Sequence, residues 1–292
     1  MSASSTTPVT VRVVTDSACD LPAAIADEFD IDIVPLTIRF GSDEFVDRDE
    51  LSVAEFWSRC VNSSTLPETA APAPGQFEAV FRSAAAAGLT GVVVVSLSGA
   101  LSATMQSAQL AARTVMADDS VQLDVRVVDS RSVTMGLGTI ALACARAAHE
   151  GATVDDIERL AADLVDRTRV FGALDTLDNL KKGGRIGNAK ALLATALSIK
   201  PIIEVSDGTV EQAGKQRTRS KALAFLVDKV KSYDGNIENL AVLHADCSDV
   251  DLFVEMLTPH YSGDIVVGEI GPVIGTHGGR GTIGVAFQVT PD

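Results

Sequence analysis

Residues 91–108 read GVVVVSLSGALSATMQSA, and this stretch decides the fold class. Its four consecutive valines, Val92–Val95, are typical of a strand that is buried on both faces of a parallel sheet. A turn rich in serine follows, and from Ala100 onward the apolar residues recur at the spacing of one helix face. In an open α/β sheet, ligands bind at the carboxyl ends of the strands, and the helix start offers free N–H groups to an anion. The stretch therefore predicts an α/β fold with a ligand site beside Ser98 and Ser102.

The alternation of strand and helix continues to about Arg167. Val11–Val14 is predicted to be a first buried strand, and Asp20-Leu21-Pro22 is typical of a helix start with aspartate at the cap and proline in the first turn. Leu123–Val128 predicts another buried strand, which ends at Asp129-Ser130. Strands that alternate with helices in this way indicate βαβ units and a parallel sheet.

Beyond Arg167 the pattern changes. Asp207-Gly208 is a two-residue turn signal between two strand-like runs and predicts a hairpin. Gly271–Phe287 contains six glycines, so we expect a loop governed by backbone freedom before a closing strand. A chain of 292 residues is long enough for two domains. We predict a disordered tail at residues 1–8, an N-terminal α/β domain at residues 9–167 and a C-terminal α/β domain at residues 168–292.

The composition excludes several classes of function. The chain carries 24 Lys and Arg against 39 Asp and Glu, a net charge of -15. We expect no nucleic-acid binding, because neutralising phosphates requires a basic surface. The four histidines are scattered and form no local metal motif, so we expect no metal site.

The sequence also bears on where the protein resides. The four cysteines lie far apart and form no CxxC pair, which favours reduced thiols in the cytoplasm. The first residues have neither the basic start nor the apolar core of a signal peptide. The weakly charged stretch Ser83–Asp118 is rich in Ala, Gly and Ser and is cut by glycines, so it does not resemble a membrane span. We therefore expect a cytoplasmic protein without a transmembrane segment.

Three hydroxyl groups are candidate ligands for a carboxylate. Thr69 lies in the Ser-, Thr- and Pro-rich segment Val61–Gly75, and Ser98 and Ser102 lie in the turn after the valine strand. Hydroxyls are neutral donors, and a hydrogen bond to a charged acceptor is roughly twice as strong as one between neutral groups. The alternative is that the two serines only cap the following helix.

His277 is the only histidine in a glycine-rich segment, GTHGGRG at residues 275–281. The glycines free the chain to place the imidazole toward a cleft, although an exposed surface histidine is the alternative. With Ser98 or Ser102 as nucleophile and His277 as base, these residues would also suit a serine-dependent acyl hydrolase or acyltransferase. Ser98, however, stands in SLSGA and not in the GxSxG motif of many hydrolases.

Two basic clusters interrupt the acidic chain. In residues 181–185, KKGGR, glycines allow close approach and Arg185 offers a planar fork for carboxylate or phosphate. This segment does not match the GxxxxGK[ST] phosphate loop. Arg217 belongs to the second cluster, together with Lys215, Arg219 and Lys221. The two clusters are either solvated surface or one patch that docks an acidic or phosphate-handling partner.

Motifs of one known family run through nearly the whole chain in the right order. They are Val14-Thr15-Asp16-Ser17, Asp20-Leu21-Pro22, Thr69 in the loop before Pro72 and Pro74-Gly75-Gln76-Phe77, Leu101 to Ala108, Val128-Asp129-Ser130, Leu180 to Ile186, Ile199-Lys200-Pro201, Gly214 to Arg217 and Gly271 to Gly281. In these motifs the chain resembles the DegV family of fatty-acid-binding proteins, which serve as the acyl-presenting subunit of bacterial fatty acid kinase. The resemblance implies a mostly parallel N-terminal sheet flanked by helices, a mixed C-terminal sheet and a ligand tunnel between the two domains.

The resemblance also implies a function. One long-chain fatty acid is expected in the tunnel, with its carboxylate bound by Thr69 and Ser102 and with Ser98 and His277 nearby. The chain is then a binding subunit and not an enzyme, and it needs no cofactor. It presents the carboxylate to a separate ATP-dependent kinase, which forms acyl phosphate for lipid synthesis.

Two further arginines enter through the resemblance. Arg185 and Arg217 correspond to family arginines that are expected to face the head group or the kinase. The sequence departs from the family pattern at two places: the usual Thr-Ser-Gln-Pro is TAAP at residues 69–72, and the usual Leu-Ser-Gly-Thr-Tyr is LSATM at residues 101–105. Two polar groups and a tyrosine are thus missing beside the expected ligand.

Overall fold

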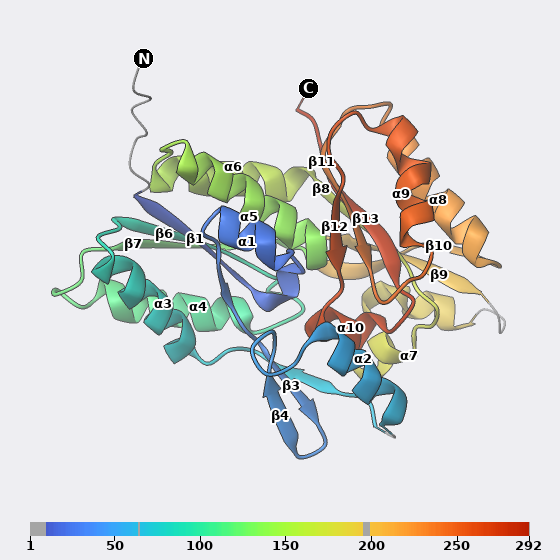
Figure 1. The fold of residues 1–292 in the computed structure, drawn as a ribbon, viewed down its shortest axis with the longest axis horizontal. Helices are drawn as coiled ribbons and strands as arrows, with labels where there is room; N and C mark the ends of the chain where they lie inside the picture. Colours follow the sequence, from blue (N-terminus) through green and yellow to red (C-terminus); the bar gives the residue numbers. More distant parts are fainter. Residues whose placement is uncertain (1–9, 64, 195–198, 292) are drawn as a thin grey trace.

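The computed structural model describes residues 10–63, 65–194 and 199–291 (Figure 1). The tail predicted at residues 1–8 lies outside the described residues. The N-terminal part is built on a four-stranded, fully parallel sheet in the order β2-β1-β6-β7. Its strands are β1 (Val11–Asp16), β2 (Asp32–Val34), β6 (Gly91–Ser96) and β7 (Asp124–Asp129). The four valines of β6 are fully buried, as the sequence predicts.

Helices cover both faces of this sheet. One face packs against α3 (Pro74–Ala86) and α4 (Thr104–Met116) through a cluster of phenylalanine, valine and alanine side chains. The other face packs against α1 (Ala23–Glu28), α5 (Thr134–His149) and α6 (Val154–Arg167). The odd- and even-numbered valines of β6 fall in different clusters, because successive side chains of a strand point to opposite faces.

The C-terminal part is built on a six-stranded mixed sheet in the order β10-β9-β8-β13-β11-β12. Only β11 and β12 run parallel, and the other neighbours are antiparallel. The strands are β8 (Thr168–Ala173), β9 (Lys200–Ser206), β10 (Thr209–Gln216), β11 (Ile237–His244), β12 (Val266–Glu269) and β13 (Ile283–Val289). The predicted α/β class, with a parallel first sheet and a mixed second sheet, is confirmed. The hairpin turn at Asp207-Gly208 also lies where the sequence predicts it.

Helix α5 lies between the two sheets and joins them (Figure 1). Helices α8 (Arg219–Lys231) and α9 (Val250–Leu257) cover the outer face of the mixed sheet. Two glycines let α5 approach its neighbours closely: a Cβ at Gly136 would lie 2.3 Å from a methyl carbon of Val170, and one at Gly138 would lie 2.6 Å from the Cys19 carbonyl oxygen. Helix α6 ends at Arg167 and β8 begins at the next residue, and the domain division at this point stays a prediction.

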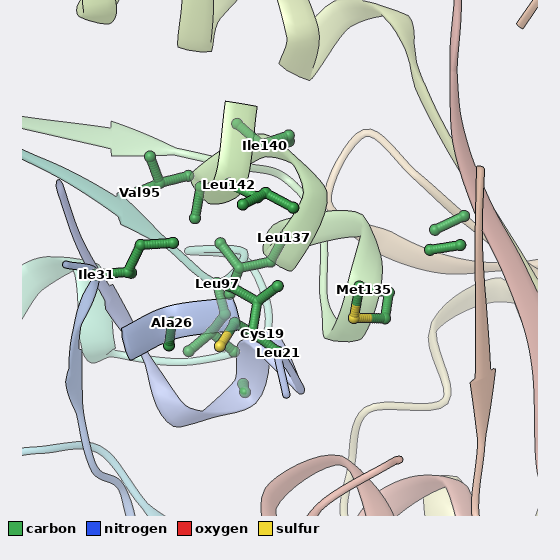
Figure 2. Close-up of a cluster of buried hydrophobic side chains, with 14 of the residues drawn as sticks. Cys19, Leu21, Ala26, Ile31, Val95, Leu97, Met135, Leu137, Ile140 and Leu142 are labelled. Carbon is green, nitrogen blue, oxygen red and sulfur yellow. The ribbon is translucent and has the colours of Figure 1, made fainter. Parts of the chain in front are cut away.

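Figure 2 shows how α5 packs against the N-terminal segment. Met135, Leu137 and Ile140 on α5 are completely buried, and they share one cluster with Cys19 and Leu21. Cys19 ends the short 3₁₀ helix η1 (Ser17–Cys19), which follows β1 directly. The turn after β1 is therefore buried and packs against α5.

A third, small sheet stands apart at the bottom of Figure 1. Its antiparallel strands are in the order β4-β3-β5, with β3 (Thr37–Phe40), β4 (Asp43–Val46) and β5 (Glu68–Ala70). Around it lie α2 (Val53–Asn62), α7 (Asp178–Lys182) and α10 (Pro272–Gly278). Two further 3₁₀ segments are η2 (Gly187–Ala194) and η3 (Thr258–His260).

Two local predictions are wrong. Part of the segment predicted as a glycine-governed loop, Gly271–Phe287, is the helix α10, which packs Gly275 against the aromatic rings of α2. Asp20 does not cap α1, whose N-cap is Pro22. The Asp20 carboxylate is buried and accepts a hydrogen bond from the backbone N–H of Gly271 at 2.9 Å. In both cases a contact distant in sequence overrides the local signal.

The described part of the chain contains no helix that is long and apolar enough to cross a membrane. All four cysteines are free, and Cys19 and Cys144 are buried.

Candidate functional site

A cavity of about 200 Å³, the central cavity, opens beside the carboxyl end of β6 where the two main sheets and the small sheet meet. On this measure a single water needs roughly 10–15 Å³, so the space suits a much larger ligand. Most of the lining is aliphatic and comes from elements of both parts of the chain, for example Leu36, Leu97, Val170, Ile203, Val205 and Leu243. Transfer of an apolar ligand from water into this space is therefore favourable.

Four of the predicted site residues line the central cavity: Thr69, Ser102, Arg185 and His277. Three of them, Thr69, Arg185 and His277, also line a second depression, the outer groove, together with Leu66, Pro67, Asn179 and Lys182. These three side chains thus stand between an apolar interior and an opening on the surface. A ligand with a long apolar part and one polar end fits this arrangement.

Thr69 and His277 are in direct contact although 208 residues separate them in sequence. Thr69 is the central residue of β5, where its neighbour across the strand pair is Ile38. His277 lies in the last turn of α10. The Thr69 hydroxyl and the His277 Nε2 are 3.1 Å apart, so the two side chains form one hydrogen-bonded unit.

The environment of His277 keeps its imidazole neutral. Burial lowers the pKa of His277 to about 4, and the positive charge of Arg185 adds to the effect. The second ring nitrogen, Nδ1, faces Gly183, where a Cβ would lie only 2.5 Å away. Glycine at position 183 is therefore the residue that leaves room for the ring.

We expect Arg185→Gln to raise the pKa of His277, because it removes the positive charge that disfavours the imidazolium. The folded pKa of His277 lies below its usual 6.5, so protonation of the ring favours the unfolded chain. The stability that the neutral ring contributes above pH 6.5 is therefore lost as the pH falls through about 4. NMR titration of the ring protons measures the change. The matched control is Arg217→Gln, an exposed arginine that lies outside the cavity lining. A His277 pKa that is equal in the two variants would contradict the assignment.

Ser102 lies in a tight turn before α4. Its hydroxyl is 2.9 Å from the Thr104 hydroxyl and accepts from the Thr104 N–H at 3.3 Å. Helix α4 begins at Thr104, later than the sequence predicts from Ala100, and its N-cap Ala103 makes no side-chain capping bond. Ser102 thus serves the helix start and lines the central cavity at the same time.

Arg185 ties two backbone segments together near Ser102. Its Nε donates to the Leu101 carbonyl at 3.2 Å, and its Nη1 donates to the Gly183 carbonyl at 2.6 Å. Arg217, in contrast, is exposed and is not part of the cavity lining or of the outer groove. The structure therefore brings only the first of the two predicted arginines to the cavity.

Ser98 occupies a different place from the one that the sequence predicts. It is completely buried, does not line the central cavity, and donates its hydroxyl proton to the carbonyl of Gly208 at 2.7 Å. Within the part of the chain that the structure describes, neither Ser98 nor Ser102 hydrogen-bonds to His277, whose Nε2 contacts Thr69. The alternative of a serine nucleophile with His277 as base thus finds no support in the geometry.

Sequence reasoning missed the aliphatic wall, because Leu, Ile and Val in a cavity wall have the same pattern as in any core. It also missed Asn179, whose side-chain amide donates to the Thr276 carbonyl at 3.2 Å and so connects α7 to α10 beside His277. Asp16 and Asp129 accept backbone N–H bonds in turns, and the described residues contain no cluster that suits a metal ion.

Comparisons with known proteins agree on one family. A family model described as "Uncharacterised protein, DegV family" matches residues 10–290. A DegV domain-containing protein of Streptomyces coelicolor is 36% identical over 282 residues, 95% of this chain and 98% of the relative. A DegV domain-containing protein of Mycobacterium tuberculosis is 36% identical over 287 residues, 96% of this chain and 98% of the relative.

Solved structures resemble the whole fold. One, described as fatty acid binding of a DegV family protein from Thermus thermophilus, has a TM-score of 0.87 and 28% identity, covering 96% of this chain and 99% of that chain. A stearic-acid-binding protein from Eubacterium ventriosum has a TM-score of 0.88 and 26% identity, covering 96% and 98%. Because the family model and the relatives span nearly the full length, the chain belongs to the DegV family.

Proposed function

We propose that the protein binds one long-chain fatty acid, with the acyl chain in the central cavity and the carboxylate at Thr69, Ser102 and His277. We further propose that it presents this carboxylate to a separate ATP-dependent fatty acid kinase, which forms acyl phosphate for lipid synthesis. The single observation that carries the proposal is that Thr69 and His277, together with Arg185, line both the apolar central cavity and the outer groove. The fatty acids bound by relatives of similar fold support the choice of ligand.

The energetics favour a ligand of this kind. Burying about 15 methylene groups at ~0.8 kcal/mol each contributes on the order of 12 kcal/mol before the cost of association is subtracted. The acyl chain therefore provides the affinity. A carboxylate is expensive to take out of water without hydrogen-bond donors, so the head group requires the polar end of the cavity.

At the polar end, Thr69 and Ser102 provide hydroxyl donors, and the lining also includes the guanidinium of Arg185. With a neutral His277 whose Nε2–H donates to Thr69, the Thr69 hydroxyl is free to donate to a carboxylate oxygen, and Ser102 offers a second hydroxyl. Arg185 adds positive charge at the outer groove, where it would face a phosphate on the acyl carboxylate. The head group is thus held in place while it stays open to a partner from the groove side.

The kinase would approach the outer groove, whose lining carries Lys182 and Arg185 against the single carboxylate of Glu68, in a chain of net charge -15. Arg217, exposed on the basic strand end after β10, is proposed to contact the kinase and not the ligand. This role places the protein in the bacterial cytoplasm with its partner, and it requires no cofactor other than the bound acid.

The direct test is to extract lipid from the purified protein and identify it by mass spectrometry. We expect about one fatty acid per chain, or uptake of one equivalent when oleic or palmitic acid is added to delipidated protein. Protein that neither retains nor takes up a fatty acid would overturn the proposal.

A double variant tests the head-group assignment. We expect Thr69→Val with Ser102→Ala to fold normally and to lower the rate of acyl phosphate formation by at least tenfold, because two hydrogen bonds to a charged group contribute about 1.5–3 kcal/mol each. The control is Thr37→Val with Ser107→Ala, which alters the neighbouring strand β3 and the helix α4 that follows Ser102, both at positions outside the cavity lining. Turnover with the kinase is measured for both, and equal rates would contradict the assignment.

A further inference from the structure

Ser98 uses every one of its polar groups within the protein. Its N–H donates to the Ser132 carbonyl at 2.9 Å, and its own carbonyl accepts from the N–H groups of Leu101 and Ser102 at 3.0 and 3.1 Å. Its hydroxyl donates to the Gly208 carbonyl at 2.7 Å and accepts from the Ala100 N–H at 3.2 Å. Ser98 therefore anchors the turn that holds Ser102, and its hydroxyl proton is not free to donate to a ligand.

The partner of this hydroxyl lies in the C-terminal part of the chain, 110 residues away in sequence. Gly208 forms the tip of the β9–β10 hairpin with a φ of 78°, and a Cβ on it would lie 2.6 Å from the Ser98 hydroxyl oxygen. Any side chain at position 208 would displace the serine. Glycine is thus required both by the backbone conformation and by the close approach.

The two strands joined by this tip form part of the cavity wall. Ile203 and Val205 of β9 and Val210 of β10 line the central cavity. The Ser98–Gly208 hydrogen bond therefore joins the aliphatic wall that would contact the acyl chain to the turn that carries a proposed head-group ligand, Ser102. Because the bond is buried, water cannot replace it without local opening.

Other contacts anchor the same turn on each side. Gly99 donates its N–H to the Asp129 carboxylate at 3.1 Å, which holds the turn to the parallel sheet. Arg185 donates to the Leu101 carbonyl and so holds the turn to the C-terminal part. Ser98 is distinguished from these by contacting the hairpin wall itself.

We propose that Ser98 is a positioning residue, which couples the β9–β10 wall of the central cavity to the Ser102 turn and thereby controls how long the ligand stays bound. The proposal rests on the proposed function, since it assumes an acyl chain in the central cavity. Movement of the wall away from the ligand and displacement of Ser102 from the head group are then one event, which requires the Ser98–Gly208 bond to break. Without this bond the wall moves independently and the ligand leaves faster.

The test measures dissociation of cis-parinaric acid, a fluorescent fatty acid, from the full chain by stopped-flow displacement with excess oleic acid. We expect Ser98→Ala to accelerate release between about twofold and tenfold, the range of one neutral hydrogen bond, with little change in the association rate. Gly208→Ala disturbs the same hydrogen bond at its acceptor residue and should also accelerate release.

The matched control is Ser96→Ala. Ser96 is also completely buried, two residues away, and its hydroxyl donates to the Asp16 carboxylate at 3.1 Å without touching the hairpin. Thermal unfolding of each variant separates loss of stability from loss of coupling. Faster release in Ser98→Ala but not in Ser96→Ala, at similar loss of thermal stability, supports the proposal.

Two results would overturn it in distinguishable ways. If Ser98→Ala releases the ligand at the wild-type rate, or if Ser96→Ala accelerates release equally, the Ser98 hydrogen bond has no special role in ligand release. Either result leaves the proposed binding of fatty acid unaffected. Failure of the wild-type chain to bind cis-parinaric acid and natural fatty acids overturns the proposed function and this coupling with it.

Discussion

Gly172→Leu is expected to weaken binding of long-chain fatty acids by more than a hundredfold while leaving the fold intact. Gly172 lies on β8 and lines the central cavity, as do Val170 and Leu174 two residues to either side, because alternate residues of a strand share a face. The neighbouring Phe171 points the other way, into the cluster beneath α8 and α9. A side chain added at position 172 therefore enters the space that the acyl chain is proposed to occupy.

The size of the effect follows from the volume displaced. A leucine side chain has four carbons, and excluding about four methylene groups at ~0.8 kcal/mol each removes roughly 3 kcal/mol of binding energy, or more than a hundredfold in Kd. Titration with acids of increasing chain length measures the loss. The longest acids should suffer most, since only they require the filled part of the cavity.

Gly172→Ala is the matched control for this prediction. A Cβ at Gly172 would meet its nearest neighbours, side-chain carbons of Ile203 and Leu174, at 3.6 Å, an ordinary contact distance. The alanine variant should therefore bind nearly as well as the wild type. If the leucine variant binds long-chain acids with wild-type affinity, the acyl chain does not lie in the central cavity.

Asp47→Asn is expected to stabilise the protein at alkaline pH relative to the wild type. Asp47 is 1% exposed, and burial raises its pKa from 3.8 to about 6, with the charge of Arg48 offsetting part of the effect. A carboxyl whose folded pKa is raised contributes stability below pH 3.8 and loses it as the pH rises through about 6. Above that pH the ionised, buried carboxylate costs roughly 3 kcal/mol, at about 1.36 kcal/mol per pH unit.

Urea unfolding of both proteins at pH 4 and pH 8 measures the difference. The gain in the free energy of unfolding for Asp47→Asn over the wild type should grow between these two pH values, because only the wild type must bury a charge at pH 8. Asp49→Asn, at an exposed position two residues away, should show no such growth. A pH-independent difference between Asp47→Asn and the wild type would contradict the argument.

Much of the fold follows from local patterns. The run of valines in β6, the two-residue turn at Asp207-Gly208 and the change of pattern near Arg167 all appear in the structure as buried strand, hairpin and the start of a mixed sheet. Such patterns succeed because burial on both faces, turn geometry and helix periodicity each act over a few neighbouring residues. They fail at Asp20 and in α10, where packing against η1 and α2 decides the conformation.

For the candidate site, too, some properties follow from the sequence and others only from tertiary contacts. The sequence by itself determined which chemical groups are present: hydroxyls at Thr69, Ser98 and Ser102, an imidazole at His277, and a family pattern that links them. Only the tertiary structure decided their partners. A serine hydroxyl is chemically the same whether it faces a ligand or a carbonyl. Ser98 donates to the Gly208 carbonyl because the tip of the β9–β10 hairpin, 110 residues away in sequence, packs against it.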